Sequence, residues 1–153
     1  MAKKKMIAKL HYNYSAKGKG ADIDLEVDLT RFNKQYGEAQ FELDSMVMAS
    51  MQPYMPMRTG TFINVTKAMS AAIAGSGTVV AAAPPMGRFL YEGKVMVDPE
   101  TNSPWARPGA KKIVINKDLD YSNPKATPHW FDTAKQNHGK SWVKAVKKIA
   151  GGG

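Results

Sequence analysis

Three histidines are the side chains best suited to acid–base chemistry in this chain of 153 residues, namely His11, His129 and His138. His129 lies three residues before Asp132, so a Ser-His-Asp arrangement can be drawn, but the sequence places no serine beside the pair. His129 and His138 are nine residues apart, a spacing that does not put them on one side of a helix. Because metalloprotease, P-loop, nucleophile-elbow and dinucleotide motifs are also absent from the sequence, we expect no enzymatic activity.

Four carboxylates alternate with apolar residues between positions 22 and 29. They are Asp22, Asp24, Glu26 and Asp28. A period of two predicts a strand with the carboxylates on one face. Residues two apart on a strand lie about 7 Å apart, whereas hard cations usually take their oxygen ligands from a folded loop. We therefore expect an acidic contact face for solvent or a basic partner, and we expect no metal or other cofactor.

The distribution of charge is the third feature with functional meaning. The net charge is +9, six lysines and no acid occur between Lys3 and Lys19, and only lysines carry charge after Asp132. Seven of the 13 acids lie between Asp22 and Asp44. This basic–acidic–basic order suits head-to-tail contacts between copies, with a solvated surface as the alternative. The lysines also suit non-specific binding to nucleic acid, although no motif for sequence readout is present.

Length and composition limit the class of protein to which this chain can belong. A chain of this length forms one domain with a core of its own, and 43% hydrophobic residues argue against global disorder. Without cysteine there are no disulfides, thiolate metal sites or thiol nucleophiles. No apolar run approaches the ~20 residues of a membrane span, and no apolar segment follows the first lysines, so we expect no signal peptide.

The clearest element that can position these residues is a helix from about Leu29 to Gln52. Its expected core stripe consists of Phe32, Tyr36, Ala39, Leu43, Met46, Val47 and Ser50. Phe41 and Met48 lie on the opposite face, where they suit packing under a loop or contact with a neighbouring subunit.

Downstream of Pro56, residues 66–73 and 78–82 flank Gly75-Ser76-Gly77 and are interpreted as a β-hairpin. The stretch Tyr91-Glu92-Gly93 is typical of a short helix that ends at a glycine.

Two strands and a final helix are expected in the C-terminal half. The strands cover residues 94–97 and 111–115, and the long connection between them carries Trp105 and Arg107. A long excursion containing residue types that anchor interfaces suggests a partner-binding arm. Thr127-Pro128 is a favourable helix start. Trp142 is central in the apolar stripe of this helix, whereas Trp130 lies off the stripe and is expected to matter less to the fold.

Three short motifs in order carry a resemblance to a known family. They are Pro-x-x-Thr-Gly-x-Phe (Pro56, Thr59, Gly60, Phe62), an aromatic-Glu-Gly turn (Tyr91, Glu92, Gly93), and Pro-His-Trp-Phe-Asp (Pro128, His129, Trp130, Phe131, Asp132). Together they resemble tailed-phage minor capsid proteins, which are similar to siphophage tail-completion, or neck, proteins. The resemblance covers roughly residues 32–149. Lys94 follows Gly93 where the family pattern has threonine, and residues 95–124 are longer than that pattern.

The expected fold is α+β, with a mixed or antiparallel sheet packed by one long central helix and a C-terminal helix. Residues 1–20 are expected to form a basic N-terminal arm or edge strand. Residues 21–150 are expected to form a single α+β domain with an extended loop at about 95–110, and 151–153 a flexible glycine tail.

The resemblance implies a structural virion protein of the phage neck that forms a ring, as a hexamer or dodecamer, between a head-completion or connector protein and a tail terminator protein. It further implies a cytoplasmic stage in the bacterial host, transient contact with packaged DNA, and no membrane. Phe41, Met48, Trp105 and Arg107 are the expected subunit or partner contacts. A basic nucleic-acid-binding protein and a minor capsid-surface protein are the alternatives.

Overall fold

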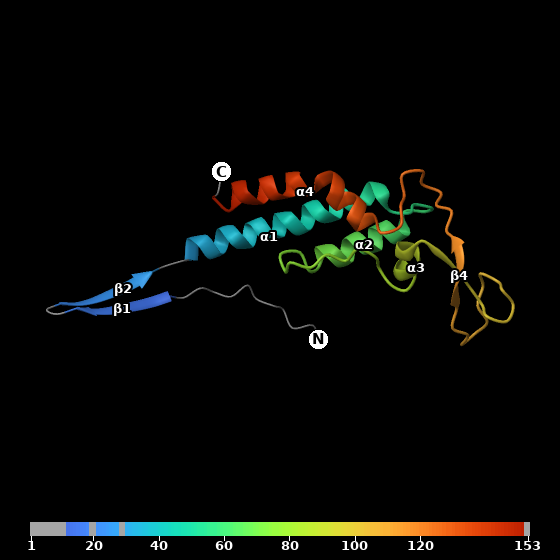
Figure 1. Ribbon diagram of the computed structural model, residues 1–153, viewed down its shortest axis with the longest axis horizontal. Coiled ribbons are helices and arrows are strands. Elements are labelled where there is room, and N and C mark those ends of the chain that lie inside the picture. The colour runs from blue at the N-terminus through green and yellow to red at the C-terminus, as the bar shows by residue number, and fades with distance from the viewer. Residues whose placement is uncertain (1–11, 19–20, 28–29, 152–153) are drawn as a thin grey trace.

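The computed structural model describes residues 12–18, 21–27 and 30–151 of the protein, and its fold is α+β (Figure 1). In chain order the elements are β1 (Tyr12–Gly18), β2 (Ala21–Val27), α1 (Thr30–Met51), the short 3₁₀ helix η1 (Gln52–Tyr54), α2 (Thr61–Ala71), α3 (Gly87–Glu92), β3 (Lys94–Val97), β4 (Ile113–Asp118) and α4 (Trp130–Ile149). None of the described helices is both long and apolar enough to cross a membrane.

The body of the molecule is built on α1 and α4, which run side by side in opposite directions (Figure 1). The 22-residue α1 lies within the range expected from its apolar period, and it gives way to the 3₁₀ turn that contains Pro53. Between the two helices, the Trp142 indole N–H donates a hydrogen bond of 3.1 Å to the Ser50 hydroxyl. The buried cluster contains Val47, Met48, Met51, Met55, Ile63, Trp130, Ala134 and Trp142.

The strands of the described residues form two separate antiparallel pairs, β1–β2 and β3–β4. The expectation of one sheet packed by two helices was wrong, because helix-to-helix packing makes the core instead. The pairs stand at opposite ends of the elongated molecule (Figure 1). In the first pair, residues from the expected N-terminal arm join the first residues of the expected domain as a single hairpin.

The expected hairpin over residues 66–82 was also wrong, since α2 extends to Ala71 and residues 78–82 form no strand. Side chains of α2 take the place of a partner strand. The Ser70 hydroxyl donates to the Val80 carbonyl and accepts from the Val80 N–H, both at 3.0 Å. One helical turn earlier, the Thr66 hydroxyl accepts a hydrogen bond of 3.2 Å from the Ala83 N–H. These hydrogen bonds satisfy backbone groups of the 80–83 segment, which pairs with no strand.

The outward face of α1 differs from the expectation at Met48. Met48 is only 6% exposed and belongs to the core, so it is not an accessible contact residue, whereas Phe41 is exposed. Phe32 and Tyr36, expected in the core stripe, are exposed. The reason is that α4 and α2 both pack on α1. The buried surface of α1 is therefore broader than the single apolar stripe predicted from the sequence, and it faces a different direction.

The last helix begins later than Thr127-Pro128 predicts. His129 adopts a left-handed conformation with φ of 49°, and α4 starts at Trp130. The His129 N–H donates to the Tyr91 carbonyl at 2.9 Å, so the chain docks on α3 before it becomes helical. The Thr127 hydroxyl instead forms a 3.0 Å hydrogen bond with that of Thr133.

Candidate functional site

The three sequence motifs meet around the indole of Trp130, which is fully buried. Tyr91 from the second motif packs edge-on against Trp130, with ring centroids 4.8 Å apart. Phe62 from the first motif approaches it edge-on at 6.0 Å. The Trp130 N–H donates a hydrogen bond of 2.9 Å to the Ala81 carbonyl, which satisfies the polar atom of the buried ring. Trp130 was expected to matter less to the fold than Trp142, but its side chain is the more deeply buried of the two.

Close backbone approach joins the second motif to the third. Gly93 ends α3 with φ of 69°, and a Cβ atom on it would lie 2.7 Å from the Cβ of Pro128. Glycine is required here for its conformation and for its lack of a side chain. On the other side of this contact, the Tyr121 hydroxyl donates to the Leu90 carbonyl at 2.5 Å. Burial raises the pKa of Tyr121, so this donor stays protonated over the ordinary pH range.

His129 is part of this junction. Its ring lies edge-on to Tyr91 at 5.0 Å, and its Nε2 is 3.7 Å from the Glu92 carboxylate. Burial, followed by the nearby charges of Asp132 and Glu92, raises the pKa of Tyr91. Within the described residues, no serine hydroxyl hydrogen-bonds to the His129 imidazole, so the triad drawn from the sequence has no geometric support. The histidine connects two packed motifs.

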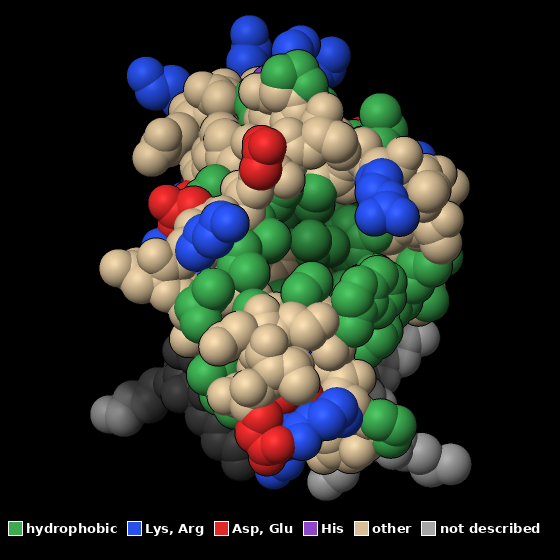
Figure 2. All heavy atoms as spheres, turned by 90° about the vertical axis from the view of Figure 1, so that its right-hand side faces the viewer, with side chains coloured by type: hydrophobic (Ala, Val, Ile, Leu, Met, Phe, Trp, Pro, Cys, Tyr) green, Lys and Arg blue, Asp and Glu red, His purple; other side chains and the backbone are tan. Residues whose placement is uncertain are grey.

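Beside this junction lies an apolar pocket of about 620 Å³. Its walls come from four segments: residues 56–65 with the first motif, the Ala83–Met86 turn with Leu90, the 119–122 segment, and Trp105. Figure 2 looks onto this end of the molecule and shows hydrophobic side chains gathered in a hollow, with charged side chains around it. Trp105 and Met86 are 84% and 60% exposed. Such a contiguous apolar surface is typical of a protein-contact site.

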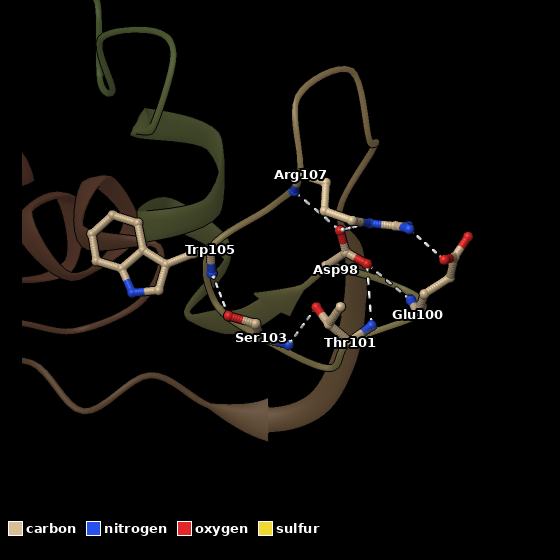
Figure 3. A network of polar contacts seen from close by, with 6 residues as sticks. All are labelled: Asp98, Glu100, Thr101, Ser103, Trp105 and Arg107. Atoms are coloured by element: carbon tan, nitrogen blue, oxygen red, sulfur yellow. Dashed lines mark hydrogen bonds and ion pairs between the residues drawn. The ribbon is translucent and has the colours of Figure 1, made fainter.

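A buried carboxylate orders the loop that carries Trp105 (Figure 3). Asp98 Oδ1 accepts hydrogen bonds from the N–H groups of Glu100 and Thr101, at 2.9 and 3.2 Å. Its Oδ2 accepts from the N–H and Nε of Arg107, at 3.1 and 3.0 Å. Arg107 also pairs with Glu100. Trp105 points away from this network, so a folded loop presents the indole at the surface.

This network gives Asp98 a distinct pH signature. The hydrogen bond from the Glu100 N–H, followed by those from Arg107, holds the Asp98 pKa well below its ordinary value. A lowered pKa in the folded state stabilises the fold at pH above the ordinary value of about 4, and this stabilisation is lost as the pH falls below it. We expect Asp98→Asn to be less stable than wild type at pH 7, with the difference shrinking below about pH 4. Denaturant unfolding from pH 7 to pH 3 measures this, and a pH-independent difference would contradict it.

The structure distributes the other predicted site residues over the molecule. Arg107 is engaged within its own loop. Phe41 lies on α1 in a second, shallower hollow with Lys34, Glu38 and Ile149, so the structure does not bring it together with Trp105. Asp22, Asp24 and Glu26 belong to β2. Asp28, the lysines at positions 3–9, Lys19 and residues 152–153 lie outside the described residues.

Two buried carboxylates were missed by sequence reasoning. One is Asp98, for which Asp-Pro-Glu-Thr is a typical turn signal. The other is Asp44 on α1, which accepts hydrogen bonds from the N–H groups of Gly75 and Gly77 at 2.8 and 3.1 Å. Asp44 has no such signal because these two glycines lie more than 30 residues away in the sequence. It fixes the glycine-rich turn to the helix.

Comparisons of the chain with protein-family models, with curated proteins and with solved structures found no match.

Proposed function

We propose that this protein is a structural component of a tailed phage that assembles at the head–tail junction as a homo-oligomeric ring. The observation that carries the proposal is the apolar end. A pocket of about 620 Å³ has the exposed Trp105 as one wall, on a loop held in shape by Asp98. Tryptophan is among the residues that most often dominate interface energies, and ordering the loop in advance lowers the entropy cost of binding.

The arrangement of the motifs also supports this proposal. Three motifs that resemble minor capsid and tail-completion proteins come from distant parts of the chain and pack on one another at Trp130. Their residues support the wall of the pocket, to which Pro56, Thr59, Gly60 and Phe62 contribute directly. The proposal includes a fold similar to that of tail-completion proteins. It also includes a connector protein and a tail terminator protein as the partners.

A second candidate function is favoured by the lysines of α4. Lys140, Lys144, Lys147 and Lys148 are exposed, lie at helical spacing, and have no carboxylate partner within the described residues. This face suits non-specific contact with a DNA backbone, alone or as part of a neck protein. Tight duplex binding with a steep dependence on salt would favour the nucleic-acid-binding alternative over an assembly role.

Deletion of the gene in the phage that encodes this chain tests the proposal. We expect negative-stain images of lysates to contain filled heads and complete tails that are not attached, and infectivity to return when the wild-type protein is supplied in trans. Normal joined virions without the protein would refute a role at the junction.

Complementation with Trp105→Ala tests the apolar end. Losing an interface anchor typically costs more than ~2 kcal/mol, which is roughly 30-fold in affinity, so we expect far fewer joined particles. The matched control is Val143→Ala, because Val143 is also exposed but lies on α4. Both variants should retain the wild-type melting temperature. Equal joining by the two variants would show that Trp105 does not form the contact.

A further inference from the structure

β4 is the outer strand of the β3–β4 pair, which stands at one end of the molecule (Figure 1). Within the described part of the chain, no third strand lies beside the pair. β3 packs against α3, whereas β4 makes no substantial contact with any described helix. Five of the six residues of β4 are exposed, and none of them lines the apolar pocket. β4 is therefore an open sheet edge, separate from the surface on which the proposed function rests.

The backbone of β4 has hydrogen-bonding groups that β3 leaves free. Consecutive residues of an antiparallel strand direct their N–H and C=O groups alternately toward the partner strand and away from it. Ile113 and Val114 each face a residue of β3, so one of the two directs both groups outward. The register then shifts, and residues 115–117 lie opposite Val95 alone. Among the described residues, nothing outside β3 hydrogen-bonds to the backbone of residues 113–117. Such an edge can accept an added strand, whose backbone supplies the missing donors and acceptors.

The side chains at this edge are apolar and β-branched. Ile113 and Val114 are 46% and 60% exposed, and Ile115 continues the run. Natural sheets usually block an exposed edge with a charged residue or a proline. Neither occurs between Lys112 and Asn116. β-branched side chains pack well against a neighbouring strand, so this stretch suits an extended partner.

Lysines flank the apolar stretch on both sides. Lys111 and Lys117 are exposed and, like Lys112, have no carboxylate partner within the residues that the structure describes. The acid at the end of the strand, Asp118, pairs with Lys94. The edge therefore carries uncompensated positive charge. Two copies of β4 placed side by side would bring their lysines together, so charge disfavours pairing of this strand with itself.

We propose that β4 binds an extended segment of a separate protein in which acidic and apolar residues alternate. The segment adds to β4 as a further strand, with its apolar side chains against Val114 and its carboxylates near Lys111 and Lys117. A helix would leave the outward backbone groups of β4 without partners, and a basic strand would be repelled by the lysines. Backbone, side chains and charge thus select the same occupant.

Hydrogen exchange on the purified chain tests this contact, with synthetic peptides as probes. The first probe alternates valine and glutamate over about eight residues, an ordinary strand length. At ten times its dissociation constant, we expect it to slow exchange of the outward amides of residues 113–117 by ~10-fold.

Two control peptides separate the features that the contact requires. A peptide of alternating valine and lysine keeps the strand propensity and reverses the charge. A peptide of alternating proline and glutamate keeps the charge but cannot pair as a strand. Neither should slow exchange in β4. Equal protection by either control, or protection by none of the three peptides, would overturn the proposal.

Charge reversal measures the contribution of the lysines. Lys111→Glu/Lys117→Glu replaces two attractions with repulsions, so we expect the valine–glutamate peptide to bind at least ~10-fold more weakly, the ratio that about 1.4 kcal/mol produces. The matched control, Lys67→Glu/Lys135→Glu, makes the same change at exposed lysines of α2 and α4 and should keep the wild-type affinity. Both variants should keep the wild-type melting temperature. Equal losses of affinity would show that the peptide responds to overall charge rather than to β4.

Sedimentation without peptide distinguishes a separate partner from a second copy of the chain. We expect the wild type and Lys111→Glu/Lys117→Glu to sediment alike. Self-association that is lost in this variant would assign the edge to a second copy and overturn the choice of occupant. These measurements use the purified chain, so their outcome is independent of the role at the head–tail junction.

Discussion

Trp130→Ala is expected to lower the free energy of unfolding by about 3–5 kcal/mol, the usual cost of emptying a buried aromatic site. The indole is fully buried, contacts Tyr91 and Phe62 edge-on, and donates its N–H to Ala81. Its removal therefore leaves a cavity, two aromatic contacts fewer and an unpaired carbonyl. Equilibrium denaturation in urea measures the loss through the midpoint at constant slope.

Trp105→Ala is the matched control for this change. It makes the same substitution at a side chain that is 84% exposed, so its effect on stability should stay within about 0.5 kcal/mol. Equal destabilisation by both variants would show that Trp130 is not the centre of the packed motifs. The two tryptophans thus separate stability from binding, because Trp130 is buried in the fold whereas the exposed Trp105 belongs to the partner contact that we propose.

Gly93→Ala is expected to cost about 2–5 kcal/mol, from two sources that add. A non-glycine residue in the left-handed region costs about 1–2 kcal/mol. The new methyl group would also lie 2.7 Å from Pro128 Cβ, and overpacking of this kind costs about 1–3 kcal/mol. The buried junction between α3 and the start of α4 would have to open. Thermal unfolding followed by circular dichroism measures the effect.

Gly109→Ala measures the conformational part of that cost alone. Gly109 also has a positive φ, 77°, but no heavy atom lies within 4 Å of a Cβ built on it. It should therefore lose only the conformational share, about 1–2 kcal/mol. A loss at Gly109 as large as that at Gly93 would mean that backbone conformation alone, rather than contact with Pro128, requires glycine in the motif.

Local signals made part of this fold predictable. The apolar period fixed α1 to within a residue or two, and the glycine after Glu92 correctly ended α3. The sequence also located β3 at residues 94–97 and β4 approximately, since a strand was expected at 111–115 and the observed one covers Ile113–Asp118. In each case the responsible residues lie within the element itself or next to it.

The parts of the fold that could not be predicted depend on contacts between residues far apart in the sequence. Residues 78–82 are β-branched and small, yet their backbone is satisfied by Thr66 and Ser70 on a helix, which no local pattern reveals. Trp130 is off the apolar stripe of α4, but at the first position of the helix its ring packs on Phe62 of α2 and Tyr91 of α3. The pocket was missed for the same reason, since four separate segments form it.

The network at Asp98 makes the segment that follows its loop a suitable place for a molecular label. The carboxylate ties the chain on both sides of Trp105, so the loop is closed at its base independently of the helical core. Gly109, just beyond that closure, faces open space. Doubling the length of a flexible loop costs only about 0.6 kcal/mol. A short epitope inserted at Gly109 would thus mark one end of the chain for antibody or gold labelling, and in the phage particle that we propose it would show how the chain is oriented.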